Sequence, residues 1–270
     1  VGVLDSGIFP HEDLKDQIRA FRDFTNKYQL PYDETGHGTH VCGILAGNGR
    51  VLHGKYKGMA PCCDLYVGKI LNKRGEGSLK TLLRGLQWLL SIAESCNIRV
   101  INISVSSIAS ASPEEQRKLY ELFQYAYENN ILIVTAAGNF GPGDNTISRL
   151  GDTPYVICVG CHDGDLENGG LRCQDCSGRG PGENVWKKPD VVAPGTQIIS
   201  CQAAYGKYVA RSGTSMATPI VSGLLALAWE KYPYLNAMQL KRKLILSATD
   251  LGESYLMQGA GMVDVEKMLS

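Results

Sequence analysis

Short apolar runs alternate with helical patterns along most of this chain. Strands are predicted at residues 1–4, 65–71, 100–104, 131–135 and 155–160, and further extended segments at 189–195 and 197–201. Helical patterns occupy residues 41–46, 78–95 and 112–130. A further helical pattern begins at residue 215, and the last one spans residues 236–247. Such alternation predicts an α/β fold of three layers, with a mostly parallel central sheet and helices on both faces.

The ends of these elements carry their own signals. Ser112 followed by Pro113 and two acidic residues is a strong helix start, because Ser caps the helix and Pro fits its first turn. Residues 14–35 are polar and lack periodicity, so they are predicted as loop. No linker, repeat or low-complexity segment divides the sequence, which favours a single domain over residues 1–270.

Composition excludes several classes of partner. Lys plus Arg number 27 and Asp plus Glu number 27, so the formal net charge is zero and no nucleic-acid partner is expected. The longest near-apolar run, residues 217–229, is too short to span a bilayer, so no membrane partner is expected either. A monomer is the expected state.

The location of the protein stays open between cytoplasmic and secreted. No basic start followed by an apolar segment is visible, but Val1 already begins a strand pattern, which indicates that residues upstream were removed or left out. The nine cysteines fall mostly inside apolar runs, and most are predicted to be reduced and buried. Their odd number mildly favours a reducing or anaerobic setting.

A glycine precedes Thr214 and Ser215 at the start of the longest apolar helix pattern. Backbone N–H groups at a helix start are unpaired and carry partial positive charge. Ser215 could therefore be a nucleophile whose developing oxyanion these groups stabilise, or Thr214 or Ser215 could simply cap the helix.

Two further residues have settings that suit catalysis. Asp5 ends a buried strand, and His37 stands just before a helix between two glycines. A Ser hydroxyl needs a base such as His to remove its proton, and the imidazole needs a carboxylate to fix its tautomer. The order Asp, His, Ser is one of the known triad orders, although order alone is weak evidence.

The local sequences around these residues are specific. Four segments matter, in this order: Asp5-Ser6-Gly7-Ile8, His37-Gly38-Thr39-His40-Val41, Ala136-Ala137-Gly138-Asn139 and Gly213-Thr214-Ser215-Met216-Ala217-Thr218-Pro219. Together they resemble the aspartate, histidine, oxyanion-asparagine and serine segments of subtilisin-like serine proteases, the subtilases or peptidase family S8. The resemblance covers most of the chain and suggests a bacterial member.

The resemblance implies a role for each matching residue. Ser215 would be the nucleophile, His37 the base and then the acid, and Asp5 the orienting carboxylate, with Asn139 and the Ser215 N–H holding the oxyanion. The implied function is a serine endopeptidase that hydrolyses extended polypeptide through an acyl-enzyme. Alternatives are a dedicated processing protease that cleaves a leader peptide or a zymogen, and a catalytically inactive binding protein.

The resemblance also implies substrate-binding segments. Ser104, Val105 and Ser106 look like the strand that pairs with extended substrate and walls the S1 pocket, and Gly75, Glu76 and Gly77 look like the opposite edge near S4. Ala136, Ala137, Gly138 and Thr214 complete the expected binding residues. Arg149 could favour an acidic P1 side chain or face solvent. A prodomain or an inhibitor is a further expected partner.

No cofactor and no metal ion is expected. The loop at residues 48–59, where many secreted relatives bind calcium, has four basic or imidazole side chains and no carboxylate, whereas calcium requires oxygen ligands. Cys158-x-x-Cys161 and Cys173-x-x-Cys176 admit three readings: a zinc site, a disulfide such as Cys173–Cys176, or free thiols.

Overall fold

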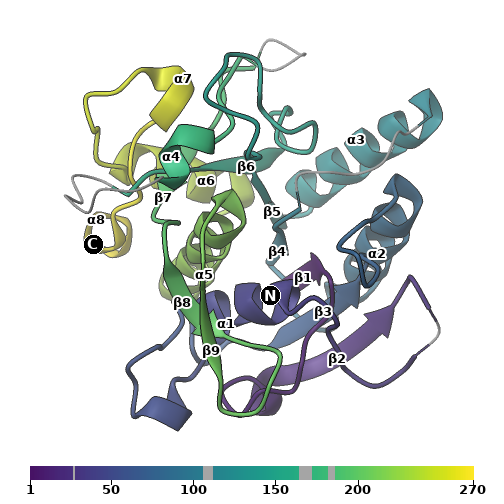
Figure 1. Cartoon of the computed structure of the whole chain (residues 1–270). Helices are drawn as coiled ribbons and strands as arrows, with labels where there is room; N and C mark the ends of the chain where they lie inside the picture. Colours follow the sequence, from purple (N-terminus) through teal and green to yellow (C-terminus); the bar gives the residue numbers. More distant parts are fainter. Residues whose placement is uncertain (27, 106–111, 164–171, 182–185) are drawn as a thin grey trace.

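Seven parallel strands form the centre of the molecule in the computed structural model, which describes residues 1–26, 28–105, 112–163, 172–181 and 186–270 (Figure 1). The strand order is β2-β3-β1-β4-β5-β6-β7. These strands are β1 (Gly2–Asp5), β2 (Ile18–Asp23), β3 (Leu65–Lys69), β4 (Val100–Ile103), β5 (Leu132–Ala136), β6 (Val156–Cys161) and β7 (Val191–Ala193). A separate antiparallel pair contains β8 (Ile198–Cys201) and β9 (Tyr208–Arg211).

Helices cover both faces of the sheet. The longer ones are α1 (His37–Ala46), α2 (Leu79–Ile92), α3 (Pro113–Glu128), α5 (Thr214–Lys231) and α6 (Ala237–Ser247). The short ones are α4 (Cys173–Cys176), α7 (Tyr255–Gln258) and α8 (Val265–Leu269), with 3-10 turns at Lys15–Gln17 and Arg50–Leu52. No helix of the described part of the chain is long and apolar enough to cross a membrane.

Side chains that alternate along each strand build two cores. On one face, Leu4 and Ile133 pack with Leu86 of α2 and Phe123 of α3 in one buried cluster. On the other face, Val134 and its neighbours pack against α5, and the strand β1 packs against α1. Because successive residues of a strand point to opposite faces, strands buried on both sides are mostly apolar. The predicted three-layer α/β fold is confirmed.

The predicted loop over residues 14–35 is wrong in its first half. Ile18–Asp23 forms β2, which pairs in parallel with β3 at the edge of the sheet. An edge strand has one solvated side, and β2 has four half-buried and two exposed positions instead of a fully buried apolar run. The sequence pattern Ile-Arg-Ala-Phe-Arg-Asp therefore gives little signal. The predicted Ser112 cap is confirmed, since its hydroxyl accepts from the Glu115 N–H at 3.2 Å.

Three candidate segments meet where the central strands end. Strand β1 ends at Asp5, β4 is followed by Ser104, and β5 by the segment that contains Asn139. In the sheet, β1 lies between β3 and β4. Strands β2 and β3 therefore lie on one side of β1, and β4 to β7 lie on the other, so the strand order reverses at β1. Open parallel sheets form crevices for ligands beyond the carboxyl ends of the strands at such a reversal.

Candidate active site

The Asp5 carboxylate and the His37 imidazole are joined by a short hydrogen bond. His37 Nδ1 lies 2.7 Å from Asp5 Oδ1, and Asp5 is fully buried at the end of β1. The same oxygen accepts from the Ser6 N–H at 2.7 Å, which fixes the carboxylate in place. An Nδ1–H that donates to a carboxylate leaves Nε2 as the basic nitrogen of the ring.

Close backbone contact places His37 at the first position of α1. Gly36 caps the helix with a left-handed backbone, φ 71°. A Cβ at Gly38 would lie 2.1 Å from the Gly7 carbonyl oxygen, so only glycine fits between the helix and the loop after β1. The Gly38 N–H donates to Ser6 Oγ at 2.9 Å, which joins the same two segments.

Asp33 is a buried carboxylate that organises these two segments. Its Oδ1 accepts from Ser6 Oγ at 2.8 Å and the Gly36 N–H at 2.9 Å. Its Oδ2 accepts from the Thr39 N–H at 2.8 Å and Thr39 Oγ1 at 2.7 Å. A negative charge is favourable at a helix N-terminus, so Asp33 stabilises α1 and holds it against the residue that follows Asp5.

Three charged groups set the pKa of His37. Burial by itself lowers that pKa, but the charge of Asp5 and the hydrogen bond to it outweigh burial, so the pKa of His37 is raised above its ordinary value. The Arg211 guanidinium opposes this effect, and Asp33 reinforces it. Arg211 is itself held near His37 because its Nη2 donates to the Thr35 carbonyl oxygen at 3.0 Å.

Ser215 is the second residue of α5. Its hydroxyl donates to the Ser104 carbonyl oxygen at 2.8 Å, so the end of β4 and the start of α5 are in contact. Buried polar contacts support this junction, because Ser222 Oγ donates to Asn102 Oδ1 at 2.8 Å and Asn102 Nδ2 donates to Ser104 Oγ at 2.9 Å. Within the described part of the chain this hydroxyl makes no hydrogen bond with His37, and such bonds often form only when substrate is bound.

The orientation of the Asn139 amide follows from its partner. Its Oδ1 accepts from the Thr214 N–H and from Thr214 Oγ1, each at 3.1 Å. Because two donors face the oxygen, the Nδ2 group points elsewhere, and it has no acceptor among the residues that the structure describes. Asn139 itself is exposed, one residue after Gly138, whose φ of 96° turns the chain after β5. The Asn139 side chain is therefore bonded to the residue that directly precedes Ser215 in the first turn of α5.

The remaining predicted site segments have definite places. Ser104 and Val105 are buried after β4, and Ser106 lies outside the described residues. Gly75, Glu76 and Gly77 form part of a turn after β3, in which the Asn72 N–H donates to the Glu76 carbonyl oxygen at 2.9 Å.

The neighbouring segment Ala136–Gly138 is held by Ser148. Its Oγ donates to the Ala136 carbonyl oxygen and its N–H to that of Ala137, both at 2.7 Å. Arg149, the next residue along the chain, is exposed. Whether any of these segments binds substrate stays a prediction.

His11, Asp13 and Cys201 are close enough together to hold a metal ion. Their atoms are already engaged: His11 Nδ1 accepts from the Asp13 N–H at 3.1 Å, and the two Asp13 oxygens accept from the Val51 N–H and the Tyr208 hydroxyl. Burial raises the pKa of the Cys201 thiol to about 12, which disfavours the thiolate that a metal would need. This cluster does not fit a metal ion.

The cysteine expectations need one correction. Cys161 and Cys173 form a disulfide, with a Cα–Cα distance of 5.7 Å, so these two are not free thiols and the pairing is not Cys173–Cys176. The two Cys-x-x-Cys motifs do not converge on a zinc ion either, because Cys158 packs with Ala137 and Ile147 in a separate cluster. The other seven cysteines are free, as predicted for most of them.

Three residues important to the site have no clear sequence signal. Asp33 and Arg211 act on His37 as described above. Lys69 at the end of β3 is fully buried, and its Nζ donates to the carbonyl oxygens of Ser6 at 2.6 Å and Leu71 at 2.8 Å. It also pairs with Glu34 at 3.3 Å. A lone Lys at the end of an apolar strand pattern does not indicate which groups it contacts. For Asp33, the one sequence signal is an acid shortly before a helix start.

Comparisons with known proteins cover nearly the whole chain. The model of the family described as "Subtilase family" matches residues 1–263. Serine protease AprX of Bacillus subtilis is 35% identical, over 98% of this chain and 65% of the relative, so this chain spans about two thirds of that protein. Subtilisin DY of Bacillus licheniformis is 33% identical, over 98% of this chain and 89% of the relative. The solved structure of S41 Psychrophilic Protease is similar with a TM-score of 0.85 and 30% identity, over 98% of this chain and 90% of that one.

Proposed function

This chain belongs to the subtilase family of serine endopeptidases, and we propose that Ser215 is its nucleophile, His37 its general base and Asp5 the carboxylate that orients the base. The observation that carries the assignment is the 2.7 Å contact of the buried Asp5 with Nδ1 of His37, on a helix that packs against α5, whose second residue is Ser215. We propose that the activity resides in one domain, residues 1–270, acting as a monomer.

Acylation begins when Ser215 Oγ attacks the carbonyl carbon of a peptide bond. His37 Nε2 takes the hydroxyl proton, and Asp5 stabilises the imidazolium through the Nδ1–H bond without taking the proton itself. The imidazolium then gives that proton to the leaving amine as the C–N bond breaks. Water, deprotonated by the same nitrogen, hydrolyses the resulting ester and returns Ser215 to its starting form.

The negative charge that develops on the carbonyl oxygen has two donors in this assignment. The Asn139 Nδ2 group is available because Thr214 occupies its oxygen, and the Ser215 N–H lies at the positive end of the α5 dipole. Loss of one such donor costs about 10²–10³-fold in kcat, a range that comes from subtilisin itself. Thr214 therefore acts by orienting Asn139.

The substrate would be polypeptide in extended conformation. Backbone pairing along the segment that begins at Ser104 and Val105, and along the turn Gly75–Gly77, would supply affinity with little dependence on sequence. Val105 is buried, and the Glu76 carboxylate accepts from Asn72 Nδ2 at 3.2 Å, so both segments are held in place by the fold.

Kinetics on peptide libraries test this function. We expect Asn139→Ala to lower kcat by about 10²–10³-fold with little change in KM, because its amide contacts the oxyanion and not the ground state. Cleavage at many sites would indicate general digestion, and cleavage at one motif a processing role. Wild-type turnover by Ser215→Ala would contradict the assignment.

A further inference from the structure

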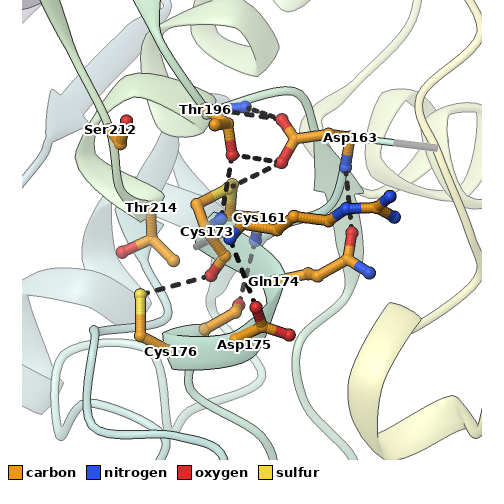
Figure 2. Close-up of a disulfide and its surroundings, with 12 residues drawn as sticks. Cys161, Asp163, Cys173, Gln174, Asp175, Cys176, Thr196, Ser212 and Thr214 are labelled. Atoms are coloured by element: carbon orange, nitrogen blue, oxygen red, sulfur yellow. Dashed lines mark hydrogen bonds between the residues drawn. A yellow bond between two sulfur atoms is a disulfide. The ribbon is translucent and has the colours of Figure 1, made fainter. Parts of the chain in front are cut away.

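The Cys161–Cys173 disulfide lies directly beneath the backbone that leads into the nucleophile helix. It joins the end of β6 to the first residue of α4, and both cysteines are almost completely buried (Figure 2). A Cβ at Gly195 would lie 2.5 Å from Cys161 Sγ, 3.1 Å from Cys173 Sγ and 2.7 Å from the Gly213 carbonyl oxygen. Gly195 is thus sandwiched between the disulfide and Gly213.

A first chain of contacts runs from the disulfide to the oxyanion site. The Gly213 N–H donates to the Gly195 carbonyl oxygen at 2.9 Å, and the next residue, Thr214, donates to Asn139. Asp163 fixes the Gly195 turn, since its Oδ1 accepts from the N–H groups of Gly195 at 3.0 Å and Thr196 at 2.9 Å. Figure 2 draws Asp163 and Thr196 on one side of the disulfide and α4 on the other.

A second chain of contacts runs from α4 to the other side of Asn139. The Cys176 carbonyl oxygen accepts from the Gly141 N–H at 2.9 Å, and the Gly178 N–H donates to the Gly138 carbonyl oxygen at 2.7 Å. The segment around Asn139 is therefore held at residues on both sides of the amide. Since the disulfide anchors α4, it constrains both the Asn139 segment and the Gly213 turn.

Cys176 is the accessible thiol of this group. It is half-buried, and burial raises the pKa of its thiol, so the attacking thiolate is a minor form whose fraction grows with pH. Both bonded sulfurs are shielded from solvent, so an external thiol cannot easily attack the disulfide directly. Cys176 lies one helical turn after Cys173, and its thiol now donates to the Cys173 carbonyl oxygen at 3.3 Å. Residues three apart on a helix lie on the same face, so Cys173 and Cys176 are neighbours. A rotation about the Cα–Cβ bond of Cys176 therefore turns its sulfur away from that carbonyl and toward the Cys173 side chain.

We propose that Cys161, Cys173 and Cys176 form a thiol–disulfide exchange site whose redox state controls the oxyanion site of the protease. The Cys176 thiolate attacks Cys173 Sγ, a new Cys173–Cys176 bond forms, the Cys161–Cys173 bond breaks, and Cys161 leaves as a thiolate that takes up a proton. A dithiol reductant then reduces the Cys173–Cys176 bond to two thiols and is itself oxidised to its cyclic disulfide. The proposal rests on the serine protease function of this chain.

Reduction is expected to lower kcat. Once α4 is released from β6, the Gly138–Gly141 segment and the Gly195–Gly213 contact lose a common anchor, so Asn139 and the Ser215 N–H are less well aligned. We expect a fall in kcat of about tenfold, smaller than the loss of an oxyanion donor. KM should change little, because no backbone hydrogen bond of the described residues joins α4 to Ser104 or to the Gly75–Gly77 turn, the segments proposed to bind substrate.

The test compares oxidised and dithiothreitol-treated wild-type enzyme. Peptide mass spectrometry defines the pairing in each sample, and a fluorophosphonate titration counts active sites, so that kcat is expressed per reactive serine. A lower kcat in the reduced sample, restored on reoxidation, supports the proposal. An unchanged kcat with Cys161 and Cys173 shown to be reduced overturns it. Failure of the titration itself would instead contradict the protease function.

Two variants test the route. Cys176→Ser should keep the kcat of oxidised wild type while its disulfide is reduced at least about tenfold more slowly, since the entry thiol is gone. Cys62→Ser, an exposed free cysteine elsewhere in the chain, is the matched control and should be reduced at the wild-type rate. Reduction of Cys176→Ser at the wild-type rate would overturn the exchange step. Because the kcat comparison uses wild-type protein, a variant that fails to fold does not affect it.

Discussion

The Asp33 carboxylate offers a direct test of how the Asp5 and His37 segments are held together. Replacement of Asp33 by Asn keeps the shape of the side chain but replaces one oxygen by an NH₂ group. If the remaining oxygen stays with Ser6 and Gly36, the new amide nitrogen faces the N–H and the hydroxyl of Thr39. The hydroxyl can rotate and accept a hydrogen bond, but the Thr39 N–H loses its acceptor.

The expected loss of stability can be worked from these contacts. Thr39 is fully buried, and an orphaned buried N–H costs about 1–3 kcal/mol. The bonds that remain become neutral instead of charge-assisted, which removes roughly a further 1 kcal/mol. We therefore expect Asp33→Asn to lower the free energy of unfolding by about 2–4 kcal/mol, with a fall in kcat/KM because α1 positions His37.

Urea unfolding in a Ser215→Ala background measures this loss without self-digestion. Asp16→Asn is the matched control, because Asp16 forms an exposed ion pair with Arg50 at 2.9 Å and should change stability by no more than about 1 kcal/mol. An Asp33→Asn variant as stable as this control would refute the role given to Asp33.

Three other substitutions probe the account. The guanidinium of Arg211 lowers the pKa of His37, so Arg211→Gln should raise that pKa and move the acidic limb of the kcat/KM profile to higher pH; an unmoved limb would contradict this. The buried Asp190 carboxylate pairs with the ammonium groups of Lys188 at 2.6 Å and Lys241 at 3.4 Å. Asp190→Asn removes their counter-charge and should cost about 3–5 kcal/mol in urea unfolding, whereas a loss below about 1 kcal/mol would show that Asp190 is dispensable. Gly38→Ala places a Cβ 2.1 Å from the Gly7 carbonyl oxygen, so we expect little folded, active enzyme; wild-type melting temperature and activity would rule out the contact.

The sequence predicted the layers of this fold because the buried strands are apolar on both sides. Runs such as residues 131–134 have no polar position, so their length and composition suffice to identify them. The edge strand β2 is half-solvated and its pattern is ambiguous, which is why it was predicted as loop. The sequence therefore identified the strands that are buried on both sides, and it missed β2, which is only partly buried.

Sequence motifs identified the groups that would do the chemistry but not those that hold them. Asp5 and His37 were predicted as partners, and the structure brings them to 2.7 Å. Asp33 contacts the Ser6 hydroxyl and Lys69 the Ser6 carbonyl oxygen, and no local pattern encodes contacts between segments so distant in sequence. The Cys161–Cys173 pairing likewise depends on how β6 and α4 pack, whereas spacing alone suggested Cys176 as a partner of Cys173.

The identity of the nucleophile is tested most directly by a fluorophosphonate, which phosphonylates an activated serine. The account predicts a single adduct on the peptide that contains Ser215, absent from Ser215→Ala and retained by Ser91→Ala, a change at an exposed serine of α2. An adduct on another residue, or equal labelling of wild type and Ser215→Ala, would contradict it.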